Sequence, residues 1–128
     1  MSGKLIIRAG VVMQQEPVFF RLDMTPSNNE IKGGNWFVYK HLKKYWDTVV
    51  FTAAYQAGWR KWFGPYGNMQ VTFSRCGYDR DNAIGGFKPV QDVIKDWRMI
   101  KDDRTSACKI EFIFDDGAEE KGVFIKLW

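Results

Sequence analysis

The sequence predicts an α+β fold in which helices pack on one sheet of mixed or antiparallel strands. The chain has 128 residues, a usual length for a single domain with one core. With 45% hydrophobic and 16% aromatic residues, it can bury a sizeable core. The predicted order is two strands, a long helix, a strand, a second helix and a closing hairpin, which indicates one helical layer on one sheet. We therefore expect one domain over residues 1–128, with residues 1–15 as a candidate extra strand.

The first half of the chain predicts two strands, a loop and a long helix. The runs KLIIRAGVVM (4–13) and PVFFRLDM (17–24) are rich in β-forming residues. The segment TPSNNEIKGGN (25–35) is dense in turn residues and predicts a polar loop. Apolar residues recur at three- and four-residue spacing over residues 36–58, which predicts a helix, and Gly58 marks its expected end.

The second half predicts a strand, a helix and a hairpin. The run MQVTFSRC (69–76) alternates between apolar and polar residues, as a half-buried strand does. A second helix is expected to begin near Pro89, since proline is tolerated in a first turn, and to end at IKDD (100–103). The runs ACKIEFIF (107–114) and VFIKLW (123–128) flank a turn-rich stretch and predict a closing hairpin.

Charge and sulfur content narrow the class of protein. The net charge is +4, and basic residues outnumber acidic ones ten to four over residues 1–78, against nine to eleven over residues 79–128. A basic region beside an acidic cluster suits an anionic partner held near a cation. Two cysteines and one histidine cannot complete a structural zinc site without carboxylates. Free thiols, no visible secretory signal and no membrane-length apolar run predict a cytoplasmic protein without membrane contact.

Two aspartates follow the central predicted strand. Asp79 and Asp81 lie one residue apart in the stretch GYDRDNAIGGFK. In an extended chain such residues point to the same side, where a divalent cation would relieve their repulsion and desolvation. Mg²⁺ takes few carboxylate oxygens, so Asp102 or Asp103 would add a ligand, and Lys88 would place a positive charge beside a scissile phosphate. The pattern fits metal-assisted phosphodiester hydrolysis, or alternatively loop acids that cap helices and form Asx-turns.

Three motifs occur in a fixed order along the chain. PSNN (26–29) lies in the loop after an early strand, DRDN (79–82) follows the central strand, and IKDD (100–103) follows the second helix. Together they resemble the RusA family of Holliday junction resolvases, small endonucleases common in phages and prophages. The resemblance covers residues 18–128, and its joint pattern is more specific than any one motif.

The resemblance implies a homodimer that cuts four-way DNA junctions with Mg²⁺, or with Mn²⁺ as a substitute, and uses no small-molecule cofactor. It implies catalytic roles for Asp79, Asp81, Asp103 and Lys88, and metal binding by the three aspartates together with Asp102. Recombination and repair in a bacterial, phage or prophage setting would be the context of this activity.

The chain also departs from the family pattern. Lys88 matches the family lysine only if three residues are inserted, and without that gap the position falls on Gly85. The family often has several arginines before D-x-D-N, whereas only Arg75 precedes it here. The stretch AIGGF (83–87) looks like a flexible insertion, and the first fifteen residues have no clear counterpart.

Basic and aromatic side chains supply candidate substrate contacts. Phosphate contacts from Lys and Arg give salt-sensitive affinity. The predicted DNA-binding residues are Lys32, Lys40, Lys43, Lys44, Arg75, Arg80, Asn28 and Asn29. Among the aromatic residues, Tyr45 and Trp46 are expected in the core. Trp59, Trp62 and Phe63 are expected first at a dimer interface, with core positions or a wedge in the junction as alternatives.

Three hypotheses follow from the sequence. The first is a Mg²⁺-dependent, homodimeric junction endonuclease, because a C2 dimer presents two equivalent sites to a substrate of approximate two-fold symmetry. The second is a non-catalytic DNA-binding module that retains the fold, suggested by the missing arginines and the glycine-rich stretch. The third is a nuclease for other branched or flap DNA.

Overall fold

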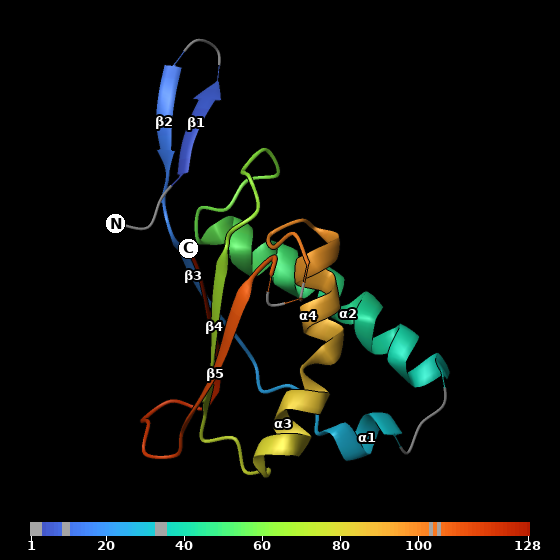
Figure 1. Cartoon of the computed structure of the whole chain (residues 1–128). Coiled ribbons are helices and arrows are strands. Elements are labelled where there is room, and N and C mark those ends of the chain that lie inside the picture. The colour runs from blue at the N-terminus through green and yellow to red at the C-terminus, as the bar shows by residue number, and fades with distance from the viewer. Residues whose placement is uncertain (1–3, 9–10, 33–35, 103, 105) are drawn as a thin grey trace.

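The computed structural model describes residues 4–8, 11–32, 36–102, 104 and 106–128. Its main body is a four-stranded sheet in the order β3–β6–β4–β5 with helices on one face, as Figure 1 shows. The strands are β3 (Val18–Leu22), β4 (Asn68–Ser74), β5 (Lys109–Asp115) and β6 (Gly122–Leu127). β6 is antiparallel to both β3 and β4, while β4 and β5 are parallel. The sheet is therefore mixed, and the predicted α+β class is confirmed.

The helices lie on one side of this sheet (Figure 1). They are α1 (Asn28–Lys32), α2 (Trp36–Gln56), α3 (Arg80–Gly86) and α4 (Lys88–Asp96), with α1 packed against α3 rather than on the strands. The predicted long helix is confirmed as α2, and Gly58 follows its end with φ +106°, a conformation that glycine adopts without strain. Within the described ranges, every helix is too short or too polar to cross a lipid bilayer.

The core lies between the sheet and the helices. The strands bury alternate residues, as in β3, where Val18, Phe20 and Leu22 are buried and the two residues between them are exposed. The helices contribute one apolar side each, formed by Trp46, Val50 and Ala54 of α2 and Val90, Val93 and Ile94 of α4. This burial of apolar area is the main favourable term in the stability of the domain.

Two expectations for aromatic residues are wrong. Tyr45 is 55% exposed rather than in the core, although its neighbour Trp46 is buried. Trp59 is a core residue, because its ring packs edge-on against Phe51 and Trp97 at centroid distances of 5.7 and 6.2 Å. For Trp59 the core alternative is therefore confirmed, and the first expectation of a dimer interface is wrong.

The N-terminal segment forms a hairpin rather than one strand. β1 (Lys4–Arg8) and β2 (Val11–Gln15) pair antiparallel and make a separate two-stranded sheet, which projects from the body in Figure 1. Its base is held by Gln15, whose buried amide donates to the Gly64 carbonyl at 2.7 Å and accepts from the Gly64 amide at 3.0 Å. The candidate extra strand of residues 1–15 is thus a pair of strands over the residues described.

The last two strands do not form the predicted hairpin. β4 lies between β5 and β6, so the chain crosses from one side of β4 to the other. The alternation of apolar residues predicts that both segments are strands but does not identify their partners. β5 is placed beside β4 by its aromatic residues, since Phe112 and Phe114 stack on Phe73 at centroid distances of 6.1 and 4.9 Å.

Three further segments differ from the expectations. The predicted loop over residues 25–35 contains α1. The stretch AIGGF belongs largely to α3 rather than to a flexible insertion, and Phe87 joins α3 to α4. α4 has Pro89 in its first turn, as expected, but it ends at Asp96, four residues before the IKDD motif begins.

Two glycines explain why AIGGF is structured. A Cβ added at Gly86 would lie 1.8 Å from the carbonyl oxygen of Pro26, and one at Gly85 would lie 2.6 Å from Cγ of Asn28. Only glycine lets the backbone of α3 come this close to the segment that precedes and begins α1. The glycine pair therefore brings the PSNN motif against the helix that begins with DRDN.

Replacement of Gly86 by alanine tests this close approach. Helix propensity alone favours alanine by about 1 kcal/mol, but the added Cβ meets a backbone oxygen that has little room to move. We expect the free energy of unfolding in urea to fall by about 2 kcal/mol or more. Gly67→Ala is the matched control, because no heavy atom lies within 4 Å of its added Cβ. Equal stability of the two variants would contradict the packing described.

Candidate functional site

The site begins where α3 starts, beyond the carboxyl end of β4. Asp79 has an extended backbone (φ −70°, ψ 165°) and is the N-cap of α3. Its Oδ1 accepts a hydrogen bond from the Asn82 amide at 2.9 Å, and its Oδ2 accepts one from Asn82 Nδ2 at 3.3 Å. A side-chain oxygen at this position satisfies an amide that has no partner within the helix. The alternative interpretation of Asp79 as a helix cap is therefore confirmed.

Asp81 lies in the first turn of the same helix. The chain is not extended through DRDN, so the same-face argument for a strand does not apply to this pair. Both carboxylates are exposed and lie at the N-terminal end of α3, where the helix dipole favours negative charge. Asp79 and Asp81 are therefore close because both lie at the start of a helix, and not because they share one face of a strand.

One side of the α3–α4 segment aligns the predicted site residues. Phe87 keeps a helical backbone (φ −77°, ψ −14°) as the C-cap of α3 and the N-cap of α4. Asp81, Gly85, Lys88 and Asp92 follow at spacings of four, three and four residues, so they share one face. Asp81 and Lys88 are seven residues apart, so they are separated by about 10 Å along this face.

This shared face points toward α1 and α2. Asn28 of the PSNN motif lies against Gly85, between the positions of Asp81 and Lys88 along the face. Further along, the Tyr39 hydroxyl of α2 donates a hydrogen bond to Oδ2 of Asp92. The fold thereby gathers the PSNN motif, the DRDN motif and Lys88 on one strip of the molecule.

The Lys43–Asp96 ion pair joins α2 to α4 along this strip, whereas the Lys88–Asp92 ion pair lies within α4. Lys88 Nζ lies 3.1 Å from Asp92 Oδ1, and Lys43 Nζ lies 2.7 Å from Asp96 Oδ2. Burial raises the pKa of Tyr39 above its ordinary value, and the hydrogen bond and charge of Asp92 raise it further. The hydrogen bond to Asp96 likewise raises the pKa of Lys43. Lys43 therefore serves first to tie α2 to α4.

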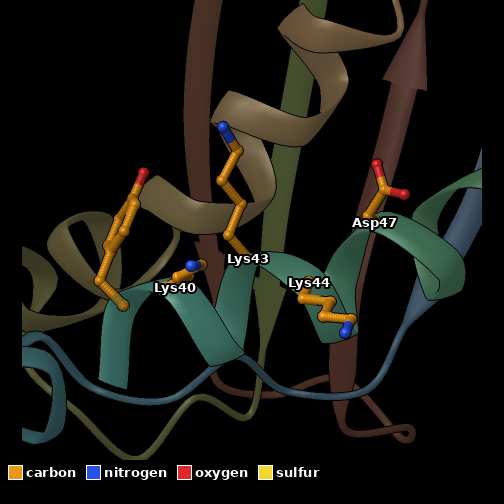
Figure 2. A pocket seen from close by; sticks show the side chains of 5 residues that line it. Lys40, Lys43, Lys44 and Asp47 are labelled. Carbon is orange, nitrogen blue, oxygen red and sulfur yellow. The ribbon is translucent and has the colours of Figure 1, made fainter. Parts of the chain in front are cut away.

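A basic hollow lies on α2 beside this strip. It has a volume of about 510 Å³ and is lined by Tyr39, Lys40, Lys43, Lys44 and Asp47. Figure 2 shows Lys43 extending toward α4 and Lys44 extending to the opposite side of α2. Because Asp96 pairs with Lys43, the net positive charge of the hollow comes from Lys40 and Lys44 against Asp47, and it suits an anionic ligand.

Other predicted residues have local roles that the sequence does not reveal. The Arg80 guanidinium lies over the ring of Phe114, 4.9 Å from its centroid. Arg75 Nη1 donates to the Glu119 carbonyl oxygen at 3.4 Å. Asn29 is exposed on α1. The side chain of Lys32 and the whole of Asp103 lie outside the described residues.

The chain after α4 returns to the amino end of β4. Tyr66, two residues before β4, forms a parallel bridge with Ile100, and its amide donates to the Met99 carbonyl at 2.7 Å. β4 then runs seven residues, or about 20 Å, to the end from which α3 follows. Figure 1 accordingly shows the connection between α4 and β5 at the end of the sheet opposite α3.

This topology separates Asp102 from Asp79 and Asp81 within one chain. Asp102 follows Ile100 by two residues and lies in an ion pair with Arg104 (Nε to Oδ2, 2.9 Å). It is thus near the amino end of β4, while Asp79 and Asp81 follow the carboxyl end. Among the residues that the structure describes, no group of three or more His, Cys, Asp or Glu side chains is arranged to hold a metal ion.

Sequence reasoning missed Tyr39. The spacing of Lys88 and Asp92 on one helix was a signal for their ion pair, but no pattern in the sequence assigns Tyr39 to the same carboxylate. That contact exists only because α2 crosses α4 at this point.

Comparison with known proteins adds no relative, since no protein-family model, curated protein or solved structure matches the chain.

Tyr39→Phe tests the tie between α2 and α4. Asp92 is only 14% exposed, so its carboxylate loses a neutral donor that water replaces poorly. We expect the free energy of unfolding to fall by about 1–2 kcal/mol at pH 8. Tyr45→Phe on the same helix is the control, and it should change stability by less than about 0.5 kcal/mol.

The pH dependence of this difference provides a second check. An unfolded tyrosine loses its proton near pH 10, and the folded pKa of Tyr39 is higher. The stabilising contribution is therefore complete below pH 10 and declines as the pH rises above it. The gap between the wild type and Tyr39→Phe should narrow above pH 10, and a gap that widens there would contradict the assignment.

Proposed function

We propose that the protein is a Mg²⁺-dependent, structure-selective endodeoxyribonuclease that cuts four-way DNA junctions. The observation that supports this proposal best is the close approach of Asn28 to Gly85, which brings the PSNN motif against the helix that begins with DRDN. It places an amide side chain at the start of α1 four residues along α3 from the exposed Asp81, and these two motifs carry part of the resemblance to RusA resolvases.

Asp79 and Asp81 are the residues that would hold the cation. Carboxylate oxygens are ligands that Mg²⁺ prefers, and an ionised carboxylate has more acceptor sites than the cap of α3 uses at Asp79. When bound, the ion would activate a water molecule and stabilise charge on the phosphate. Exposure of both carboxylates leaves room for a DNA backbone beside them.

Lys88 and the basic hollow would bind and orient the DNA backbone. Lys88 shares a face with Asp81 and is held by Asp92, which limits where its ammonium group can go. Lys40 and Lys44 of the hollow extend the positive surface along α2. Such contacts fix the position of a nucleic acid without reading its sequence.

The separation of the acids motivates a shared site in a homodimer. Asp102 cannot join Asp79 and Asp81 within one chain, because the length of β4 lies between them. A two-fold related copy can set the amino end of one β4 near the carboxyl end of the other. We infer that the Asp102–Asp103 pair of one protomer completes the cation site of its partner.

Asp81→Asn tests the catalytic assignment. We expect the rate of junction cleavage in Mg²⁺ to fall by about a thousandfold, equivalent to ~4 kcal/mol of transition-state stabilisation, while junction binding in a gel shift persists. Asp116→Asn, in an exposed turn far along the chain, is the control and should cut at the wild-type rate. Cleavage that survives in Asp81→Asn would refute the assignment.

Mixed dimers test the shared site. Asp81→Asn and Asp103→Asn protomers should each be inactive alone. If the site is shared, a heterodimer of the two contains one intact site, so mixing them should restore nicking of one strand. If the site lies within one chain, the mixture stays inactive. Nicked and resolved products separate on a native gel, which distinguishes these outcomes.

The alternative function is a non-catalytic module that binds DNA junctions. It is favoured by the use of Asp79 as a helix cap and by the ion pair of Asp102 with Arg104. A wild-type protein that shifts a junction in a gel but gives no products over a titration of Mg²⁺ and Mn²⁺ would support this function. Comparison of four-way, three-way and flap substrates would identify a nuclease for other branched DNA.

A further inference from the structure

The second face of the sheet is left open by the helices. Figure 1 shows the helices on one side of the β3–β6–β4–β5 sheet. On the open side lie the residues that alternate with the core positions, among them Phe19, Phe124 and Lys126, while Val18 and Ile125 beside them are buried. Phe19 is 60% exposed, so much of its ring is accessible to a partner.

Three aromatic rings surround Lys126 on this open face. Phe124 and Trp128 lie two residues before and after it on the same side of the chain, and Phe19 is its cross-strand partner on β3. The rings of Phe19 and Phe124 stack with centroids 6.2 Å apart and planes 28° from parallel. Lys126 Nζ lies 5.2 Å from the centroid of the Trp128 ring. We call these four residues the aromatic platform.

Charge is distributed unevenly across the same face. The exposed Lys126 lies in the half formed by β3 and β6, beside Arg21, which is paired with Glu120 at 2.8 Å. Glu111, on the β5 side, accepts a hydrogen bond from Gln70 at 3.0 Å. Arg21 also pairs with Asp23, so Lys126 supplies the positive charge among the rings, whereas the exposed charges of β5 on this face are Lys109, Glu111 and Asp115.

We propose that the aromatic platform binds single-stranded nucleic acid, with bases stacked on its rings and a backbone phosphate at Lys126. Every base has a π face, so exposed rings on a sheet bind single strands with little sequence preference. A lysine among the rings contacts the phosphate of a stacked strand. This function goes beyond the cutting of junctions and uses the face opposite to the proposed active site.

A second copy of the chain fits this face less well. The face is small, since four strands of five to seven residues span a flat area of about 400 Å². An apolar partner would also bury Lys126 among rings without a compensating anion, which is costly. A polyanion with flat bases satisfies both the rings and the ammonium group.

The test measures binding of a dye-labelled oligothymidylate by fluorescence anisotropy, without Mg²⁺ so that no cleavage interferes. The double variant Phe19→Ala/Phe124→Ala should weaken binding about tenfold or more. Lys126→Gln should weaken it less and reduce the slope of log affinity against log salt concentration by about one. Phe37→Ala is the matched control, because Phe37 is also 60% exposed but lies on α2, and its dissociation constant should equal that of the wild type.

A second measurement on the wild type keeps the proposal testable if a variant misfolds. Ultraviolet cross-linking to an oligonucleotide that contains 5-bromodeoxyuridine should label the segment 122–128, which mass spectrometry can identify after cleavage at Lys121 and Lys126 as the peptides 122–126 and 127–128. Unchanged affinity of the double variant, or cross-links confined to α2, would overturn the proposal. So would a dimer in sedimentation that the double variant dissociates while oligonucleotide affinity is unchanged. Junction cleavage enters none of these readouts, so a failure here leaves the proposed nuclease untouched.

Discussion

The close approach of the Pro26–Asn28 backbone to Gly85 and Gly86 is the constraint on which the site depends. Any side chain at these two positions would push α1 away from α3. With α1 in place, an amide side chain lies beside the helix that carries Asp81, and α2 begins close enough to reach α4. A flexible segment at residues 83–87 could not hold this arrangement. The start of α1 and α3 must both be rigid if the groups around Asp79 and Asp81 are to keep fixed positions.

Polar contacts of Asp92 and Asp96 determine the positions of the lysines around α2 and α4. Asp92 is held from two sides, by Tyr39 and by Lys88, and Asp96 pairs with Lys43. These contacts satisfy half-buried groups rather than adding large amounts of stability, because exposed ion pairs contribute little on their own. Their effect is positional: they determine which lysines remain near the carboxylates and which are committed to joining helices. Asp92 therefore has a structural role even where no substrate is bound.

The topology of the mixed sheet determines which charged and aromatic side chains lie together and which lie apart. Its parallel pair, β4 and β5, forces the chain between them to return from one end of the sheet to the other, so acids that are near in sequence end up far apart. The same sheet, with helices on one face, carries aromatic rings on the β3–β6 half of the other face, among them the exposed Phe19 stacked on Phe124. The molecule thus presents two surfaces of different chemistry, an ionic one on the helices and an aromatic one on the strands.

Local patterns in the sequence were sufficient for much of this description. The α+β class, the extent of α2, its end near Gly58, the strand β4 and the proline in the first turn of α4 all follow from periodicity and backbone preferences, which act between residues close in the chain. The sequence also singled out Asp79 and Asp81, and the helix cap was among the alternatives that it allowed. The catalytic and metal-binding roles remain predictions.

Contacts between distant residues were decided by the tertiary structure alone. Nothing in the alternation of β5 and β6 reveals that β4 lies between them, and nothing in AIGGF reveals that a carbonyl oxygen from residue 26 fills the space of a missing Cβ. The pairing of Tyr39 with Asp92 and the distance of Asp102 from Asp79 likewise depend on how the helices and strands are stacked. Sequence patterns record which face of an element is apolar, whereas the choice of neighbour depends on the shapes of two elements at once, and no single segment encodes it.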